Sequence, residues 1–137
     1  ECSGQWVTIQ KEVVDRLVAN PGTKAWGPLT AIVRAFASAR RIALLPPGCF
    51  WPAPKVTSAM AELVPCASDS RPSDPDGFAR FVTKLLSQRR KQIGGILGHD
   101  ITTSLRIEAQ TRAETLDAGQ LLELRDHLPA DHHLLQP

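Results

Sequence analysis

Apolar side chains in the first half of the chain alternate between the spacing of strands and that of helices. Segments rich in β-branched, aromatic or other apolar residues lie at positions 6–9, 41–45 and 58–64 and indicate strands. Segments with apolar residues at helical spacing lie at positions 10–19 and 28–39. The order strand, helix, helix, strand, strand predicts an α/β arrangement whose last two strands are joined by a long loop.

The second half of the chain has the pattern of helices that follow a linker. Residues 65–76 are mostly serine, proline and aspartate and offer almost nothing to bury. A helix is predicted from Asp76, its expected N-cap, with apolar residues at helical spacing as far as Ile96. Three glycines weaken the end of this helix, at positions 94, 95 and 98.

A last helix is predicted from Asp117, with Gln120 as the capping-box partner and Leu116 and Leu121 as a hydrophobic staple. Residues 129–137 are expected to fray. These patterns divide the chain into an α/β part, a linker and a small all-helical domain, at residues 1–66, 67–76 and 77–137.

Composition narrows the class of protein. Hydrophobic residues make up 42% of the 137, and no apolar run approaches the ~20 residues of a membrane span. The three cysteines are odd in number and lack metal-ligand spacing, which predicts reduced thiols in a cytoplasmic protein. The histidines form no pair at ligand spacing on a firm helix, so no metal site is predicted.

Charge is distributed unevenly along a chain whose formal net charge is only +2. No acidic residue lies between Asp76 and Asp100, whereas five basic residues do: Arg80, Lys84, Arg89, Arg90 and Lys91. On a helical wheel, three of them fall on one solvent-facing flank: Arg80, Lys84 and Lys91. Such a stripe is either a solvated face or a surface for phosphates. Arg89 falls instead among the apolar residues, where a buried guanidinium needs a carboxylate or several carbonyls.

A stiff loop precedes the last predicted strand. Prolines at positions 46, 47, 52 and 54 restrict its backbone, and Phe50, Trp51 and Lys55 lie among them. Rigid aromatics beside a cation suit the stacking of a nucleobase. The alternative is a proline-rich connector whose aromatics cover the core.

Four motifs in this order resemble the ribosomal RNA adenine dimethyltransferases. They are QKEVVDRL at 10–17, NPGTKAWGPLTAIV at 20–33, FWPAPKVTSA at 50–59 and SQRRK at 87–91. The resemblance implies that residues 1–66 are the C-terminal part of a Rossmann-like methyltransferase sheet whose final strand is antiparallel to its neighbours. It also implies that residues 77–137 are a helical domain that contacts RNA.

The resemblance also implies roles for particular residues. The aromatic before the proline–lysine motif of the family stacks on the target adenine, a role that falls on Phe50. Trp51 is a second candidate at a position where the family varies, and Lys55 either contacts phosphate or is structural. In the helical region, Arg80, Lys84, Arg90 and Lys91 are expected to contact RNA phosphates. Arg89 is hypothesised to be an interdomain latch.

The parts of such an enzyme that hold the methyl donor are not in this sequence. It has no GxGxG loop with a following acid for S-adenosylmethionine, and no N-[LI]-P-[YF] motif to orient the target amine. We therefore expect no catalytic and no cofactor-binding residue here, and an inactive fragment of a larger enzyme. The expected partner is small-subunit ribosomal RNA in the pre-ribosomal subunit, bound by a monomer.

Two alternatives remain open at this point. The parent protein could be the related large-subunit methyltransferase of the macrolide-resistance type, although NPGTKAWG and SQRRK favour the small-subunit family. It could instead be a noncatalytic RNA-binding protein or a transcription-factor relative of the same fold. Departures from the family pattern at Trp26, Pro28 and Thr57 weaken the assignment of RNA contacts more than the assignment of the fold.

Overall fold

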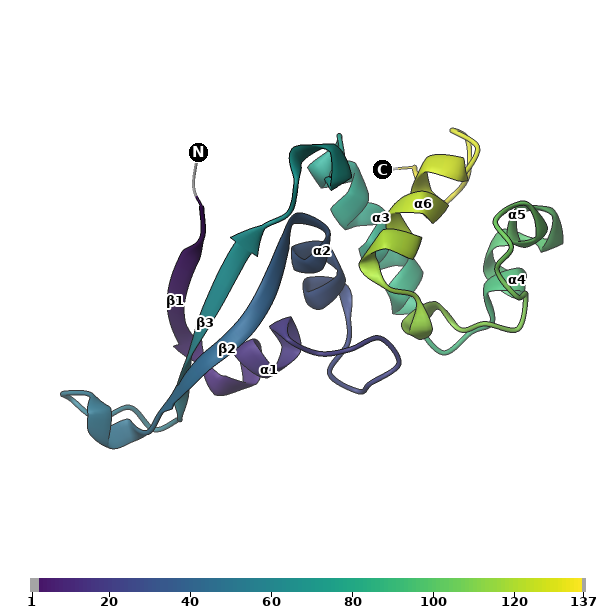
Figure 1. Ribbon diagram of the computed structural model, residues 1–137. Helices are drawn as coiled ribbons and strands as arrows, with labels where there is room; N and C mark the ends of the chain where they lie inside the picture. The colour runs from purple at the N-terminus through teal and green to yellow at the C-terminus, as the bar shows by residue number, and fades with distance from the viewer. Residues whose placement is uncertain (1–2, 137) are drawn as a thin grey trace.

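A computed structural model describes residues 3–136, apart from the side chain of His99. Cys2, one of the three cysteines, lies outside the described residues; Cys49 and Cys66 are free thiols. A small antiparallel sheet with two helices on one face forms one end of the molecule, and the remaining helices form the other end (Figure 1). This arrangement confirms the predicted mixed α/β class.

The sheet has three strands in the order β1-β3-β2, with β3 antiparallel to both neighbours. They are β1 (Gln5–Gln10), β2 (Ala37–Leu45) and β3 (Ser58–Pro65). All three predicted strands are therefore present. The last strand enters between the other two, as expected for the end of a Rossmann-like methyltransferase sheet. A register shift between Arg41 and Ala43 interrupts the pairing of β2.

Two helices cover one face of the sheet: α1 (Lys11–Leu17) and α2 (Pro28–Phe36). The sequence predicted that the second helix would continue to residue 39, which is wrong. The backbone becomes extended at Ala37, where β2 begins to pair with Pro65 of β3. Ladder hydrogen bonds to a central strand therefore decide the conformation of residues 37–39 against their helical pattern.

Asp15 joins α1 to the sheet. Its carboxylate accepts a hydrogen bond from Lys11 one turn earlier, and it pairs with Arg41 of β2 at 2.8 Å. The hydrogen bond from Lys11, with the charges of Lys11 and Arg41, holds the pKa of Asp15 below its usual 3.8. The opposing effect of burial is smaller. The carboxylate is therefore ionised at neutral pH and fixes the helix against β2.

The helical part begins earlier than predicted, at α3 (Pro75–Ser87). Its N-cap is Asp74 and not Asp76, because Asp74 Oδ1 accepts a hydrogen bond from the backbone N–H of Gly77 at 2.9 Å. Pro75 occupies the first helical position, where its missing N–H has no cost. A β-carbon at Gly77 would lie 2.0 Å from Asp74 Oδ2, so only glycine fits inside this cap.

The long helix predicted as far as Ile96 is divided in two. Residues 88–90 form a turn, and α4 (Ile93–Leu97) and α5 (His99–Ser104) follow as short helices. The break occurs because the backbone pairs across to another segment: Gln92 bridges Arg112, and Ile93 N donates to Thr111 O at 2.7 Å. A β-carbon at Gly94 would lie 2.8 Å from that of Ala109, so this close approach requires glycine.

The last helix, α6 (Ala118–His127), starts where the sequence predicted. Asp117 and Gln120 form the capping box, each side chain bonded to the other's backbone N–H. Leu116 and Leu121 are both buried in one cluster, as a staple requires. The expected fraying after residue 129 is wrong for the described part of that segment, because Leu134 is buried in the core. Pro137 lies outside the described residues.

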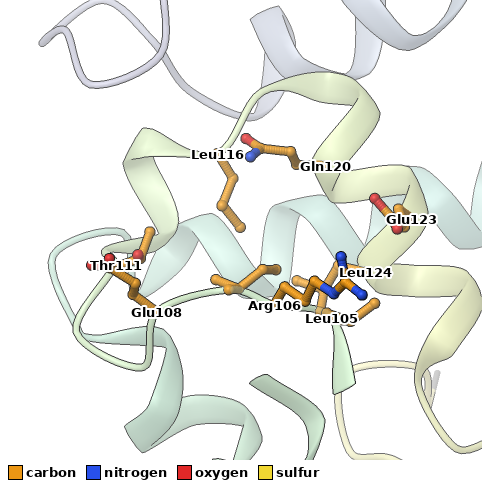
Figure 2. Close-up of a pocket in the computed structure, with 9 residues that line it drawn as sticks. Leu105, Arg106, Glu108, Thr111, Leu116, Gln120, Glu123 and Leu124 are labelled. Carbon is orange, nitrogen blue, oxygen red and sulfur yellow. The ribbon is translucent and has the colours of Figure 1, made fainter. Parts of the chain in front are cut away.

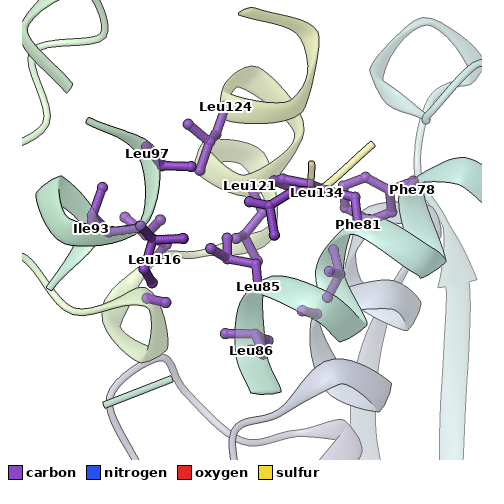
Figure 3. Packing of buried hydrophobic residues seen from close by; sticks show 14 of the residues in the cluster. Phe78, Phe81, Leu85, Leu86, Ile93, Leu97, Leu116, Leu121, Leu124 and Leu134 are labelled. Atoms are coloured by element: carbon purple, nitrogen blue, oxygen red, sulfur yellow. The ribbon is translucent and has the colours of Figure 1, made fainter. Parts of the chain in front are cut away.

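One hydrophobic core joins α2 to the helical part (Figure 3). Trp26 and two alanines of α2 belong to the same buried cluster as the apolar faces of α3, α4 and α6. A second, smaller cluster lies between the sheet and α1. The division at residues 66 and 77 remains a prediction, and α2 contributes to the core on the far side of it. In the described part of the chain, no helix has the length and apolar character needed to cross a bilayer.

Candidate functional site

The proline-rich loop projects from the end of β2 and β3, away from the helices (Figure 1). Its first part is a short turn of 3₁₀ helix at Pro47–Cys49, in which Cys49 N donates to Pro46 O at 2.9 Å. Its far end is tied to α1 by a hydrogen bond from Lys11 N to Thr57 O at 3.0 Å. The second end of the loop is therefore held against α1.

The two aromatic residues of this loop differ in exposure. Trp51 is 98% exposed, whereas Phe50 is half-buried. The side chain of Lys55 is exposed on the same loop. All three predicted residues lie in the loop between β2 and β3. Stacking of a base on Phe50 or Trp51 remains a prediction.

A basic depression of about 750 Å³ lies where α3 ends. This hollow, called the basic depression below, is lined by six residues: Ser87, Gln88, Arg89, Arg90, Lys91 and Arg112. Four of these side chains are cationic and none is acidic. Arg90, Lys91 and Arg112 are exposed. An open hollow with this charge attracts anionic groups such as phosphates.

The break after α3 creates the basic depression. Since α3 ends at Ser87, the SQRRK motif turns away from the helix axis, and the bridge between Gln92 and Arg112 sets the second segment beside it. Arg112 was missed by the sequence analysis. It lies outside the four motifs and more than twenty positions after Arg90, so only the pairing in space reveals it.

The predicted cationic stripe on one helix is wrong. Lys91 lies beyond the end of α3, so it cannot share a helical flank with Arg80 and Lys84. Arg80 is exposed near the start of α3, where it lines a separate hollow with Asp74 and Arg125. The half-buried Lys84 donates through Nζ to the backbone carbonyl of Gln136. Contact of Arg80 or Lys84 with RNA stays a prediction, at a site distinct from the basic depression.

Arg89 connects the two halves of the chain. Its Nε donates to Glu114 Oε2 at 2.8 Å, and its Nη2 donates to the carbonyl of Thr23 in the loop after α1 at 3.1 Å. The carbonyl of Glu114 accepts from Gly22 N at 2.7 Å in the same loop. The predicted position of Arg89 on the apolar side of a helix is wrong, because the residue lies at a turn and its side chain is 31% exposed. The contacts are those that a latch would need.

We expect replacement of Arg89 by glutamine to lower the free energy of unfolding by about 1–3 kcal/mol. The substitution leaves the carboxylate of Glu114, which is only 17% exposed, without its closest cation. A double-mutant cycle with Glu114→Gln, measured by urea unfolding, should give a coupling energy of about 1 kcal/mol.

Arg112→Gln is the matched control, because its Nη1 lies 4.0 Å from Glu114 Oε1 and its side chain is 59% exposed. That variant should change stability by less than about 0.5 kcal/mol. Equal effects of the two arginine substitutions would contradict the assignment of Arg89 as the latch.

The proline-rich loop projects from the sheet, away from the helices, whereas the residues of the basic depression follow the end of α3 (Figure 1). The structure therefore does not bring Phe50 and Trp51 near Arg90 and Lys91. A ligand that touches both must be an extended macromolecule. Among the described residues, no group of three or more His, Cys, Asp or Glu side chains could hold a metal ion.

Comparison with known proteins places these features in a family. The family model described as ribosomal RNA adenine dimethylase matches residues 3–129. This chain belongs to that family. The match covers β1 to α6 and so includes both the proline-rich loop and the basic depression.

Curated relatives match most of this chain. The ribosomal RNA small subunit methyltransferase A of Erwinia tasmaniensis is 38% identical over 127 residues, which cover 89% of this chain and 46% of the relative. The enzyme of the same name from Acidithiobacillus ferrooxidans is 40% identical, over 86% of this chain and 46% of the relative. The chain thus spans about half the length of the curated relatives it matches, and corresponds to a C-terminal portion of them.

Solved structures share the fold. A dimethyladenosine transferase from Plasmodium falciparum superposes with a TM-score of 0.81 at 21% identity, over 89% of this chain and 56% of the other. The 23S rRNA methyltransferase ErmE superposes with a TM-score of 0.53 at 17% identity, over 92% of this chain and 55% of the other. At these identities the likeness establishes the fold.

Proposed function

We propose that this chain is the RNA-contacting part of an enzyme that dimethylates adenine amines in small-subunit ribosomal RNA. Family membership and the names of the curated relatives support the reaction and the substrate. The observation that carries RNA contact is the basic depression, where Arg90, Lys91 and Arg112 are exposed around a hollow without an acid. Such a surface binds phosphates by releasing their counterions.

The proline-rich loop would supply one wall of the adenine pocket. An exocyclic amine is reached only when its base leaves the helix, and an aromatic surface offsets part of the cost of unstacking. Phe50 and the exposed Trp51 are the candidates for this surface, and Lys55 of the same loop is the candidate for a phosphate contact. A base held at this loop while the basic depression binds a distant stretch of backbone fits a large, folded RNA. We propose that the protein acts on the pre-ribosomal small subunit as a monomer.

The methyl donor would be S-adenosylmethionine, but the described residues do not fit it. β1 passes into α1 at Lys11 without an intervening glycine-rich loop. The two described glycines with positive φ, Gly22 and Gly98, follow helices and not strands. In this proposal the residues of this chain contact RNA.

Salt dependence of RNA binding tests the proposal. We expect the chain to bind an in vitro transcript of small-subunit rRNA, measured by filter binding between 50 and 200 mM salt. Three phosphate contacts predict that log K falls with log salt at a slope of about −2 to −3. A large-subunit transcript serves as the comparison substrate and should bind more weakly. A slope near zero would overturn the assignment of the basic depression, and equal or tighter binding of large-subunit RNA would favour the macrolide-resistance type of enzyme.

A further inference from the structure

A second pocket, which the proposed function does not use, lies between α6 and the segment after α5 (Figure 2). Its volume is about 260 Å³. The side chains that matter to its chemistry are three leucines and three charged residues: Leu105, Leu116, Leu124, Arg106, Glu108 and Glu123. Leu116 and Leu124 are buried members of the main core, so the floor of the pocket is apolar and firmly packed.

The size of this pocket limits what can occupy it. Cofactors and drug-sized ligands occupy clefts of ~300–1,000 Å³, and this pocket is smaller. It is large enough for one amino-acid side chain. Side chains that insert into such pockets at protein interfaces are enriched in arginine and large aromatic residues.

The carboxylates at the rim decide which side chain fits. Glu108 and Glu123 are both exposed, and neither carboxylate has a hydrogen bond or ion pair within the described part of the chain. Arg106 is the one cation in the pocket lining, and no ion pair joins it to either of them in that part of the chain. The rim therefore has an excess of negative charge over an apolar floor. An arginine side chain matches both, because its methylene stem packs on leucine while its guanidinium pairs with carboxylates.

The backbone fixes Arg106 at this rim. The end of α5 is a Schellman motif, in which Ile107 N donates to Thr102 O at 3.0 Å and Arg106 N donates to Thr103 O at 3.2 Å. Arg106 occupies the left-handed position of this motif with φ 54°, where glycine is usual. Its charge opposes entry of a second cation, so its removal should favour binding.

We propose that this pocket binds an arginine side chain from a basic segment of a partner protein. RNA is the less suitable occupant, because Glu108 and Glu123 repel its phosphates. The proposal does not depend on the basic depression or on the methylation reaction. It assigns the C-terminal region a protein contact in addition to its proposed RNA contact.

Titration of the ¹⁵N-labelled chain with N-acetyl-arginine amide, followed by NMR, tests this. We expect saturable shifts of the amides of Glu108 and Glu123, and much smaller shifts with N-acetyl-norleucine amide, which has the stem without the charge. The double variant Glu108→Gln/Glu123→Gln should bind the arginine derivative about three- to fivefold more weakly. Arg106→Gly should bind it about twofold or more tightly.

Glu12→Gln controls for loss of an acid elsewhere, since Glu12 is exposed on α1, and should leave the affinity unchanged. Equal shifts with the norleucine derivative would overturn the proposal. So would an affinity for the arginine derivative that is the same in the wild-type chain, in Glu108→Gln/Glu123→Gln and in Arg106→Gly. Shifts of these amides caused by RNA and not by the arginine derivative would assign the pocket to nucleic acid. If the amide shifts of Glu108 and Glu123 change with protein concentration when no arginine derivative is added, the pocket binds a second copy of the chain.

Discussion

A variant with Arg90, Lys91 and Arg112 all changed to glutamine will bind small-subunit rRNA at least about tenfold more weakly at 50 mM salt. The slope of log K against log salt will become less negative by about 2–3, because each lost phosphate contact removes close to one unit. The three side chains are exposed and line the same hollow, so their removal leaves the core untouched. Filter binding over a salt series measures both quantities.

The control variant loses the same net charge elsewhere. Arg16, Arg34 and Arg106 lie outside the basic depression, and changing all three to glutamine should reduce affinity much less. If both triple variants weaken binding equally, the attraction is a property of overall charge and the basic depression is not the RNA site. Unfolding of each variant by urea verifies that the fold is intact.

Phe81→Ala will lower the free energy of unfolding by about 3–5 kcal/mol. Phe81 is fully buried on α3, in the cluster that also contains residues of α2 and α6 (Figure 3). Loss of the ring removes apolar contacts and leaves a cavity that packed neighbours cannot fill. For a domain of this size, a loss of this magnitude is a large share of the total stability.

The same substitution also tests whether the two ends of the molecule unfold together. Because α2 shares the core with α3 and α6, the sheet and the helices should unfold together. Spectroscopic signals from both parts should then show the same single transition in urea. Arg80→Ala, at an exposed neighbour on α3, should change stability by less than about 0.5 kcal/mol. Two separated transitions would support the division at residues 66 and 77 as independent domains.

The sequence predicted local structure correctly where residues close together in the chain determine it. The capping box at Asp117 and Gln120 formed as predicted, because both partners lie within one helical turn. The three strands also appeared where β-branched and apolar residues gather. At Asp76 the local reasoning went wrong, since Asp74 with Pro75 makes the better cap two residues earlier.

The predictions from the sequence failed where the backbone forms hydrogen bonds with a segment distant in the chain. The helical pattern of residues 88–96 ignores the hydrogen bonds that Ile93 and Gly94 make with Thr111 and Ala109. The helical wheel drawn for that helix therefore placed Lys91 on α3, although this residue lies in the segment after it. For the same reason Arg112 could not be recognised as a member of the basic depression.

The sequence by itself determined the family, through four motifs whose order does not depend on any contact in space. It also indicated the candidate site residues: Phe50 and Trp51 in a stiff loop, and a run of cations at the end of α3. Only the tertiary structure decided how these cations are grouped, because the break after Ser87 and the bridge to Arg112 are long-range hydrogen bonds. The pocket beside Arg106 likewise exists only in the folded chain, since packing of α6 against residues 105–111 brings Glu108 and Glu123 over one apolar floor.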